Sequence, residues 1–233
     1  MKTVLFAAAI LGSLAFGTVP EHVENKAYAP GKMPALEEPA PSLKFADSEW
    51  LDVRPIRAPK CDSGEVWRLF TTHQIAAAAI KEKSIPVKGT FKRVFAYATS
   101  GEENFKGSGA VDLSSYDSGL PARDYRVLKH VFAVEKKGKS VLPFTFVLTK
   151  KEPQTLKVDF KFEGTPISLE FPVKTKREGG RVTVKTQKAA RFTFLTSENM
   201  DAFSQLIQKC NHQFLASFAD VSLDFVLENV CIK

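Results

Sequence analysis

The sequence is poor in the residue patterns that build metal and redox sites. It holds three cysteines and four histidines, with no C-x-x-C pair and no histidines at zinc-ligand spacing. Ligands need such spacings to converge on one ion, so we expect no metal and no cofactor. A G-x-S-x-G nucleophile elbow and a phosphate-binding glycine loop are also absent. These absences argue against an enzyme.

Aromatic residues with polar tips are scarce too. There are 4 Tyr and 2 Trp against 19 Phe, so the large apolar side chains carry almost no hydroxyl or N–H that burial would have to satisfy. The net charge of +7 suggests attraction to anionic surfaces such as a membrane, and we expect no nucleic-acid partner.

Long hydrophobic runs are limited to the N-terminus. Lys2 precedes an apolar run from Val4 to Phe16, which is too short to span a bilayer and is typical of a secretory signal peptide. We assign residues 1–17 to it. Cleavage after Gly17 is favoured over cleavage after Ala29, because Pro30 follows Ala29. The mature protein is therefore expected to be exported.

Proline is concentrated between residues 18 and 62, which predicts an extended N-terminal segment. The folded domain is expected over 63–233. Cys61 precedes the first strand and Cys231 ends the last, so a closed sheet would bring them together. A Cys61–Cys231 disulfide is our first expectation. No bridge, or a bridge to Cys210, stays open at this stage.

Period-two alternation dominates the rest of the chain. Apolar residues recur at every second position in eight segments, which predicts antiparallel strands with one apolar face. About eight such strands must pair into a sandwich or curl into a barrel. The segments are 87–99, 107–115, 141–148, 156–164, 165–174, 181–186, 190–195 and 221–230.

Two helices are predicted between the strands. Residues 198–212 carry apolar residues at helical spacing. Residues 120–131 place Pro121 at the first helical position and Asp124 in the first turn. Asp112, Asp117 and Asp124 stand close enough in sequence for acid–base work, but turn and cap positions explain them more simply.

The stretch around this second helix resembles the YceI-like family of polyisoprenoid-binding proteins. The family's Ser-x-Asp, Arg-Asp, Leu and Phe positions are held by Ser115, Asp117, Arg123, Asp124, Leu128 and Phe132. Gly89-Thr90-Phe91, the hairpin 156–171 and the last strand are also similar to family segments, so the resemblance covers about residues 65–231. The chain departs from the family in its short Gly164-Thr165-Pro166 turn, in lacking a His before Gly89, and in its strongly helical 197–214 segment.

The resemblance implies an all-β fold, an antiparallel eight-stranded lipocalin-like barrel with a lengthwise tunnel. It also implies a periplasmic protein that holds an isoprenoid quinone, a polyprenyl phosphate or a similar long-chain lipid, for carriage or storage. The alternative is a non-catalytic structural or interaction module of the envelope with a filled core. Whether two chains pair as a homodimer is left open.

On this view the inward-facing residues form the ligand site. Arg93 and Arg123 are the candidates for contact with a head group. The full expected set is Phe91, Arg93, Phe95, Val111, Leu113, Arg123, Leu128, Phe132, Phe144, Phe146, Phe160, Phe162, Leu169, Phe171, Phe194, Leu223 and Phe225.

Overall fold

The computed structural model describes residues 22–30, 59–61, 64–70, 75–81, 85–134, 140–196 and 199–231. The expected signal peptide lies outside the described residues, as does most of the proline-rich segment.

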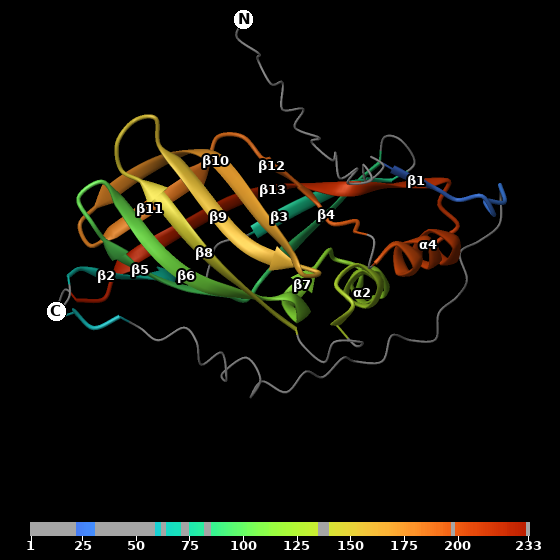
Figure 1. The fold of residues 1–233 in the computed structure, drawn as a ribbon, viewed down its shortest axis with the longest axis horizontal. Coiled ribbons are helices and arrows are strands. Elements are labelled where there is room, and N and C mark those ends of the chain that lie inside the picture. Colours follow the sequence, from blue (N-terminus) through green and yellow to red (C-terminus); the bar gives the residue numbers. More distant parts are fainter. Residues whose placement is uncertain are drawn as a thin grey trace, which may run out of the picture.

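Eight antiparallel strands close into a barrel, which confirms the barrel and excludes the sandwich (Figure 1). The hydrogen-bonded order is β11-β10-β9-β8-β6-β5-β2-β13. The ring closes because β13 also pairs with β11, from Arg181 opposite Glu228 to Lys185 opposite Asp224. The strands are β2 (Val66–Phe70), β5 (Val94–Ser100), β6 (Asn104–Asp112), β8 (Val141–Thr149), β9 (Thr155–Phe162), β10 (Thr165–Glu178), β11 (Arg181–Thr186) and β13 (Phe214–Asn229).

Five further strands lengthen the wall at one end of the barrel. They are β1 (His22–Glu24), β3 (Ile75–Lys81), β4 (Ile85–Phe91), β7 (Tyr116–Asp117) and β12 (Ala190–Thr193). The first half of β13 pairs with β3, β12 and β1, whereas its second half pairs with β2 and β11. The pairing β3–β4–β7 continues this extension.

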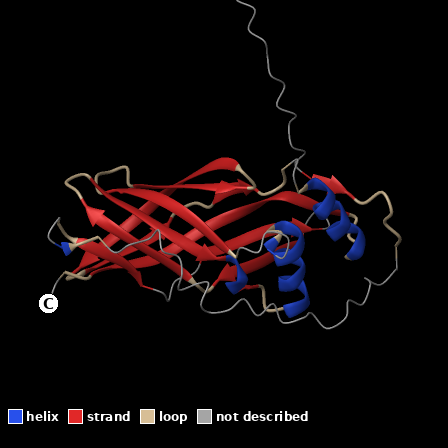
Figure 2. Cartoon of the chain, turned by 60° about the horizontal axis from the view of Figure 1, so that its bottom comes forward, coloured by secondary structure: helices blue, strands red, loops and turns tan. Residues whose placement is uncertain are grey.

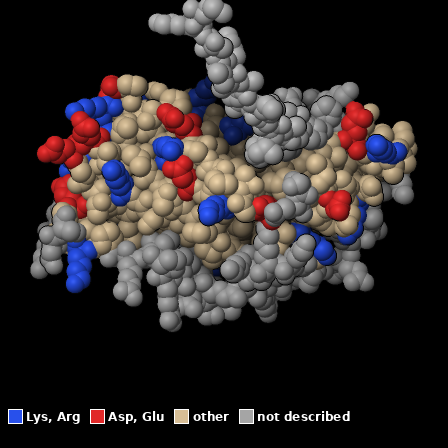
Figure 3. Space-filling model, in the orientation of Figure 1, with Lys and Arg blue, Asp and Glu red and all other residues tan. Residues whose placement is uncertain are grey.

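The predicted alternation sets which side of each strand is buried. In β10, Leu169, Phe171 and Val173 are buried, while Glu170 and Pro172 between them are exposed. Successive side chains of a strand point to opposite faces, so closing the sheet turns one whole apolar face inward. Figure 3 shows acidic and basic side chains interspersed over the face of the molecule that it presents.

The two predicted helices lie together at one end of the barrel, which we call the helix end (Figure 2). After the short 3₁₀ turn η2 (Leu113–Ser115), the helix predicted near 120–131 begins as α2 (Pro121–Arg126) and continues as a π-helix, η3 (Val127–Val131). The helix predicted near 198–212 is α4 (Met200–Lys209). Within the described part of the chain, no helix has the length and apolar character needed to cross a membrane.

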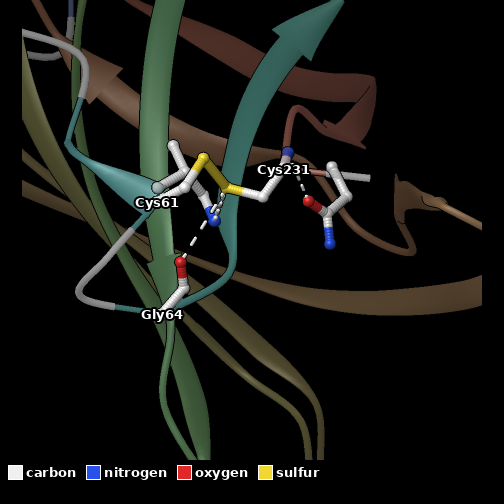
Figure 4. Close-up of a disulfide and its surroundings, with 5 residues drawn as sticks. Cys61, Gly64 and Cys231 are labelled. Atoms are coloured by element: carbon white, nitrogen blue, oxygen red, sulfur yellow. Dashed lines mark hydrogen bonds between the residues drawn. A yellow bond between two sulfur atoms is a disulfide. The ribbon is translucent and has the colours of Figure 1, made fainter. Parts of the chain in front are cut away.

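The opposite end carries the tight turns after β5, β8 and β10, and we call it the hairpin end. Trp67 and Phe105 pack edge to face there, with ring centroids 5.4 Å apart, beside the fully buried Leu148. These side chains fill the hairpin end. The structure also joins Cys61 to Cys231, 170 residues apart in sequence, where the last strand finishes (Figure 4). Cys210 is buried and lies outside this disulfide.

One expected strand divides in two. Residues 87–99 form β4 and β5, which are separated at Lys92 and Arg93. There the chain stops pairing with β7 and begins pairing with β6. The interruption moves the inward positions by one residue, from Phe91 to Val94 and Ala96, and leaves Phe95 on the other face.

Candidate ligand cavity

A cavity of about 560 Å³ runs inside the barrel. Its lining reaches from Arg126 and Leu206 at the helix end to Leu156 and Leu227 towards the hairpin end. Beyond those two leucines the barrel is filled, so the cavity is blind at the hairpin end. Volumes of 300–1,000 Å³ are usual for small-molecule sites, and nearly all of this lining is apolar.

Small residues on two neighbouring strands leave room for the cavity. Ala96 on β5 and Gly107 and Gly109 on β6 face the large Phe144 and Phe146 of β8. Gly107 pairs with Phe146 and Gly109 with Phe144, so each ring lies across a glycine. A Cβ on Gly109 would sit 2.4 Å from the Phe144 ring, which means that any larger residue would push that ring away. The Gly-Ser-Gly sequence therefore has a packing role.

Most of the predicted site residues meet on this cavity. The lining includes Phe91, Val111, Leu113, Arg123, Phe132, Phe144, Phe146, Phe160, Leu169, Phe171, Phe194, Leu223 and Phe225. They come from strands on every side of the barrel, and only the closure of the sheet brings them together.

Four predicted site residues lie elsewhere. The assignment of Arg93 and Phe95 to the inward face is wrong, because the break between β4 and β5 reverses the alternation there. Arg93 instead forms an ion pair with buried Asp112, Nη2 to Oδ2 2.6 Å. Leu128 is buried in a cluster with Phe91 and Val94, and Phe162 packs edge to face on Phe192 behind the cavity wall.

Sequence reasoning missed most of the polar lining. Tyr116 on β7, Arg126 on α2 and His212 after α4 all face the cavity, as does Arg123. Tyr116, Arg123 and Arg126 come from one stretch of the chain, but His212 lies far from it in sequence, so no local pattern could have grouped all four. Phe203 and Leu206 of α4 were visible as a helical apolar stripe, but not as cavity lining. We call Tyr116, Arg123, Arg126 and His212 the polar mouth.

Asp124 anchors the first turn of α2, next to Arg123. Asp124 Oδ1 accepts hydrogen bonds from the backbone N of Ser118, at 2.9 Å, and from Ser118 Oγ, at 2.5 Å. These bonds tie the start of α2 to the preceding loop and engage the Asp124 carboxylate. Arg123 is half-buried, and no hydrogen bond or ion pair to another described residue is made by its guanidinium. Arg126 Nη1 donates to Cys210 Sγ at 3.7 Å.

Tyr116 is a neutral donor in this setting. Burial raises the pKa of its hydroxyl to about 12, with the charge of Asp124 adding to the rise and that of Arg123 opposing it. Gly89 makes room for the ring, since a Cβ there would lie 2.3 Å from the Tyr116 hydroxyl oxygen. The family-like Gly89 is thus needed for the position of one polar-mouth residue.

The three neighbouring acids are engaged in local structure. Asp112 accepts from Ser114 and pairs with Arg93, Asp117 pairs with Lys92, and Asp124 holds Ser118. The Lys92 hydrogen bond and then the Gly119 N–H lower the pKa of Asp117. Among the described residues, no three His, Cys, Asp or Glu side chains gather as metal ligands would.

Comparisons with known proteins agree with this geometry. The model of the YceI-like domain family matches residues 67–228. No curated protein matches the chain. Among solved structures, the chain is similar to a polyisoprenoid binding domain from Saccharophagus degradans implicated in plant cell wall breakdown, at 13% identity and a TM-score of 0.59, covering 70% of this chain and 98% of that one. It is also similar to BcnA of Burkholderia cenocepacia, at 14% identity and a TM-score of 0.50, covering 66% and 95%. At such low identities these two likenesses concern the fold.

Proposed function

This chain belongs to the YceI-like domain family, and from that premise we propose that it is an exported, non-catalytic container for one long-chain lipid. The lipid is an isoprenoid quinone, a polyprenyl phosphate or a similar amphiphile, carried or stored in the envelope. The solved polyisoprenoid binding domain that shares this fold supports a lipid of this class.

The observation that carries the proposal is the apolar cavity of about 560 Å³ in the barrel. A module with a filled core would close this space with side chains, as happens at the hairpin end. Each CH₂ buried against such a lining contributes about 0.8 kcal/mol, so a long tail binds well with few polar contacts. Tunnel shape and the polar mouth would then supply specificity.

Export is proposed from the N-terminal apolar run, and a disulfide between Cys61 and Cys231 suits an oxidising compartment. We propose cleavage after Gly17. Cleavage after Ala29 would remove β1, which pairs with β13 from His22 opposite Ala216 to Glu24 opposite Phe214. N-terminal sequencing of the protein from the periplasmic fraction tests this. A mature chain that begins at residue 30 would contradict it.

The net charge of +7 supports transient contact with an anionic membrane surface during loading or release. Co-sedimentation with vesicles that contain anionic lipid should exceed co-sedimentation with neutral vesicles, and the difference should shrink at high salt. Equal sedimentation with both would remove this part of the proposal.

The main test is extraction of the mature protein from its native host with organic solvent, followed by mass spectrometry. A stoichiometric long-chain lipid is expected. Phe144→Arg, on the cavity wall, should abolish uptake and leave a folded, monodisperse protein. Thr145→Arg is the matched control, because Thr145 is the next residue of β8 and is exposed. If Phe144→Arg still takes up lipid as well as Thr145→Arg does, or if extracts contain no lipid, the filled-core alternative is favoured.

A further inference from the structure

We propose that the ligand carries an anionic head group, a phosphate or a carboxylate, at the polar mouth, with a tail of about twenty carbons in the barrel. This inference rests on the proposed function, and it selects among the lipids that the function allows. It follows from two independent features, the charges that line the cavity and its volume.

The polar mouth brings two arginines to the cavity. Arg123 and Arg126 line it together with His212 and Tyr116. The carboxylate nearest in sequence, Asp124, is held by Ser118 and is not part of the lining. Among the described lining residues, the other charged one is Asp224, which is exposed on β13, next to Phe225 and far along the strand from α4.

Arg123 is the residue that most requires a partner. A half-buried guanidinium has lost part of its hydration, and burial of a charge is costly until the charge is paired. No other described residue provides a hydrogen bond or ion pair to it. A phosphate or carboxylate fits the planar donor set of Arg and forms charge-assisted bonds. A neutral quinone head would leave the guanidinium without a counter-charge.

The remaining members of the polar mouth suit the same head group. Tyr116 retains its proton at neutral pH, so its hydroxyl can donate a second hydrogen bond to an anion. Arg126 already contacts Cys210 Sγ and adds positive potential from the next turn of α2. An anion placed here would meet donors from β7 and α2, which the Asp124–Ser118 bonds hold in position.

The volume sets the length of the tail. One water molecule takes up roughly 30 Å³ in the liquid, and we take the same volume for each carbon group of the tail. A cavity of about 560 Å³ then holds about twenty carbons, or four isoprene units. Because the hairpin end is filled by Trp67, Phe105 and Leu148, a longer tail cannot extend through it. Further isoprene units should therefore stay near water and add little affinity.

Binding of three matched probes tests the head group. They are geranylgeranyl monophosphate, phytanic acid and neutral geranylgeraniol, each with twenty carbons in an isoprenoid skeleton, measured by displacement of a fluorescent fatty probe from the delipidated protein. We expect the phosphate or the carboxylate to bind about 10–100-fold more tightly than the alcohol, the range for charge-assisted hydrogen bonds. Arg123→Gln should remove most of that preference, because it should weaken binding of the two anions far more than binding of the alcohol. Arg191→Gln, at an exposed arginine paired with Asp220, is the control.

The results of these experiments distinguish a failure of this inference from a failure of the proposed function. Equal binding of all three probes, or an anion preference that survives Arg123→Gln, overturns the head-group assignment and leaves the container intact. Binding of none of them overturns both. For the tail, affinity should rise from the farnesyl to the geranylgeranyl phosphate and level off beyond it. A continued rise with longer polyprenyl phosphates would overturn the length limit.

Discussion

Gly109→Ala should destabilise the barrel, although it adds only one methyl group. The new Cβ would lie 2.4 Å from the Phe144 ring, 2.4 Å from the Phe95 carbonyl oxygen and 2.7 Å from the Ala96 Cβ. The ring can rotate into the cavity, but the carbonyl belongs to the paired strand β5, so the backbone must shift. Overpacking of this kind costs about 1–3 kcal/mol. At about 2–4 °C per kcal/mol for a domain of this size, thermal unfolding should show the loss directly.

Gly101→Ala is the matched control for this substitution. Its Cβ would meet nothing closer than the Asn104 carbonyl oxygen at 3.5 Å, an ordinary contact, so its free energy of unfolding should stay within about 0.5 kcal/mol of the wild type. Adding Phe144→Leu to Gly109→Ala should recover part of the stability, since it relieves the ring but not the carbonyl. Equal melting temperatures for Gly109→Ala and the wild type, with unchanged lipid uptake, would refute the packing argument.

Three further predictions concern other parts of the molecule. Cys231→Ser removes the disulfide that closes a 170-residue separation and should lower the free energy of unfolding by about 2–5 kcal/mol; chemical denaturation that shows no difference from the oxidised protein would contradict this. Asn211→Gly keeps the left-handed backbone (φ 47°) but deletes the side chain's two hydrogen bonds to the arm that contains β1, so hydrogen exchange of residues 22–30 should accelerate while the barrel amides keep their protection. The folded pKa of Tyr116 is about 12, against an ordinary 10.0, so its contribution to the free energy of unfolding is complete below pH 10 and is lost as the pH rises to about 12. Ultraviolet titration should show a tyrosine that ionises near pH 12, and Arg123→Gln should raise the pKa of this tyrosine further, because the charge of Arg123 lowers it.

The wall of the barrel could be predicted from sequence because it depends on local alternation. Leu169, Phe171 and Val173 read as one apolar face, and they are buried on one face of β10. The helices near 120–131 and 198–212 were also predictable, since Pro121 and the stripe of Phe203, Leu206 and Ile207 are local signals.

The inward face of β5 could not be predicted. Lys92 and Arg93 look like ordinary members of an alternating strand, yet the chain changes partners there, and Arg93 leaves the inner face to pair with Asp112. That change depends on where β6 and β7 lie, which no neighbouring residue encodes. Ala96 was overlooked for the same reason, although its small side chain helps to leave the cavity open.

Taken alone, the order of residues determined that the chain forms a one-sided antiparallel sheet rich in phenylalanine, because side-chain direction in a strand has a period of two. Only the tertiary structure decided that this sheet surrounds a space. Pairing of β13 with both β2 and β11 closes the ring, and Gly107 and Gly109 beneath two phenylalanine rings determine how much room is left inside it. The grouping of Tyr116, Arg123, Arg126 and His212 is likewise a product of closure, because helices from two distant segments come together at the same end of the barrel.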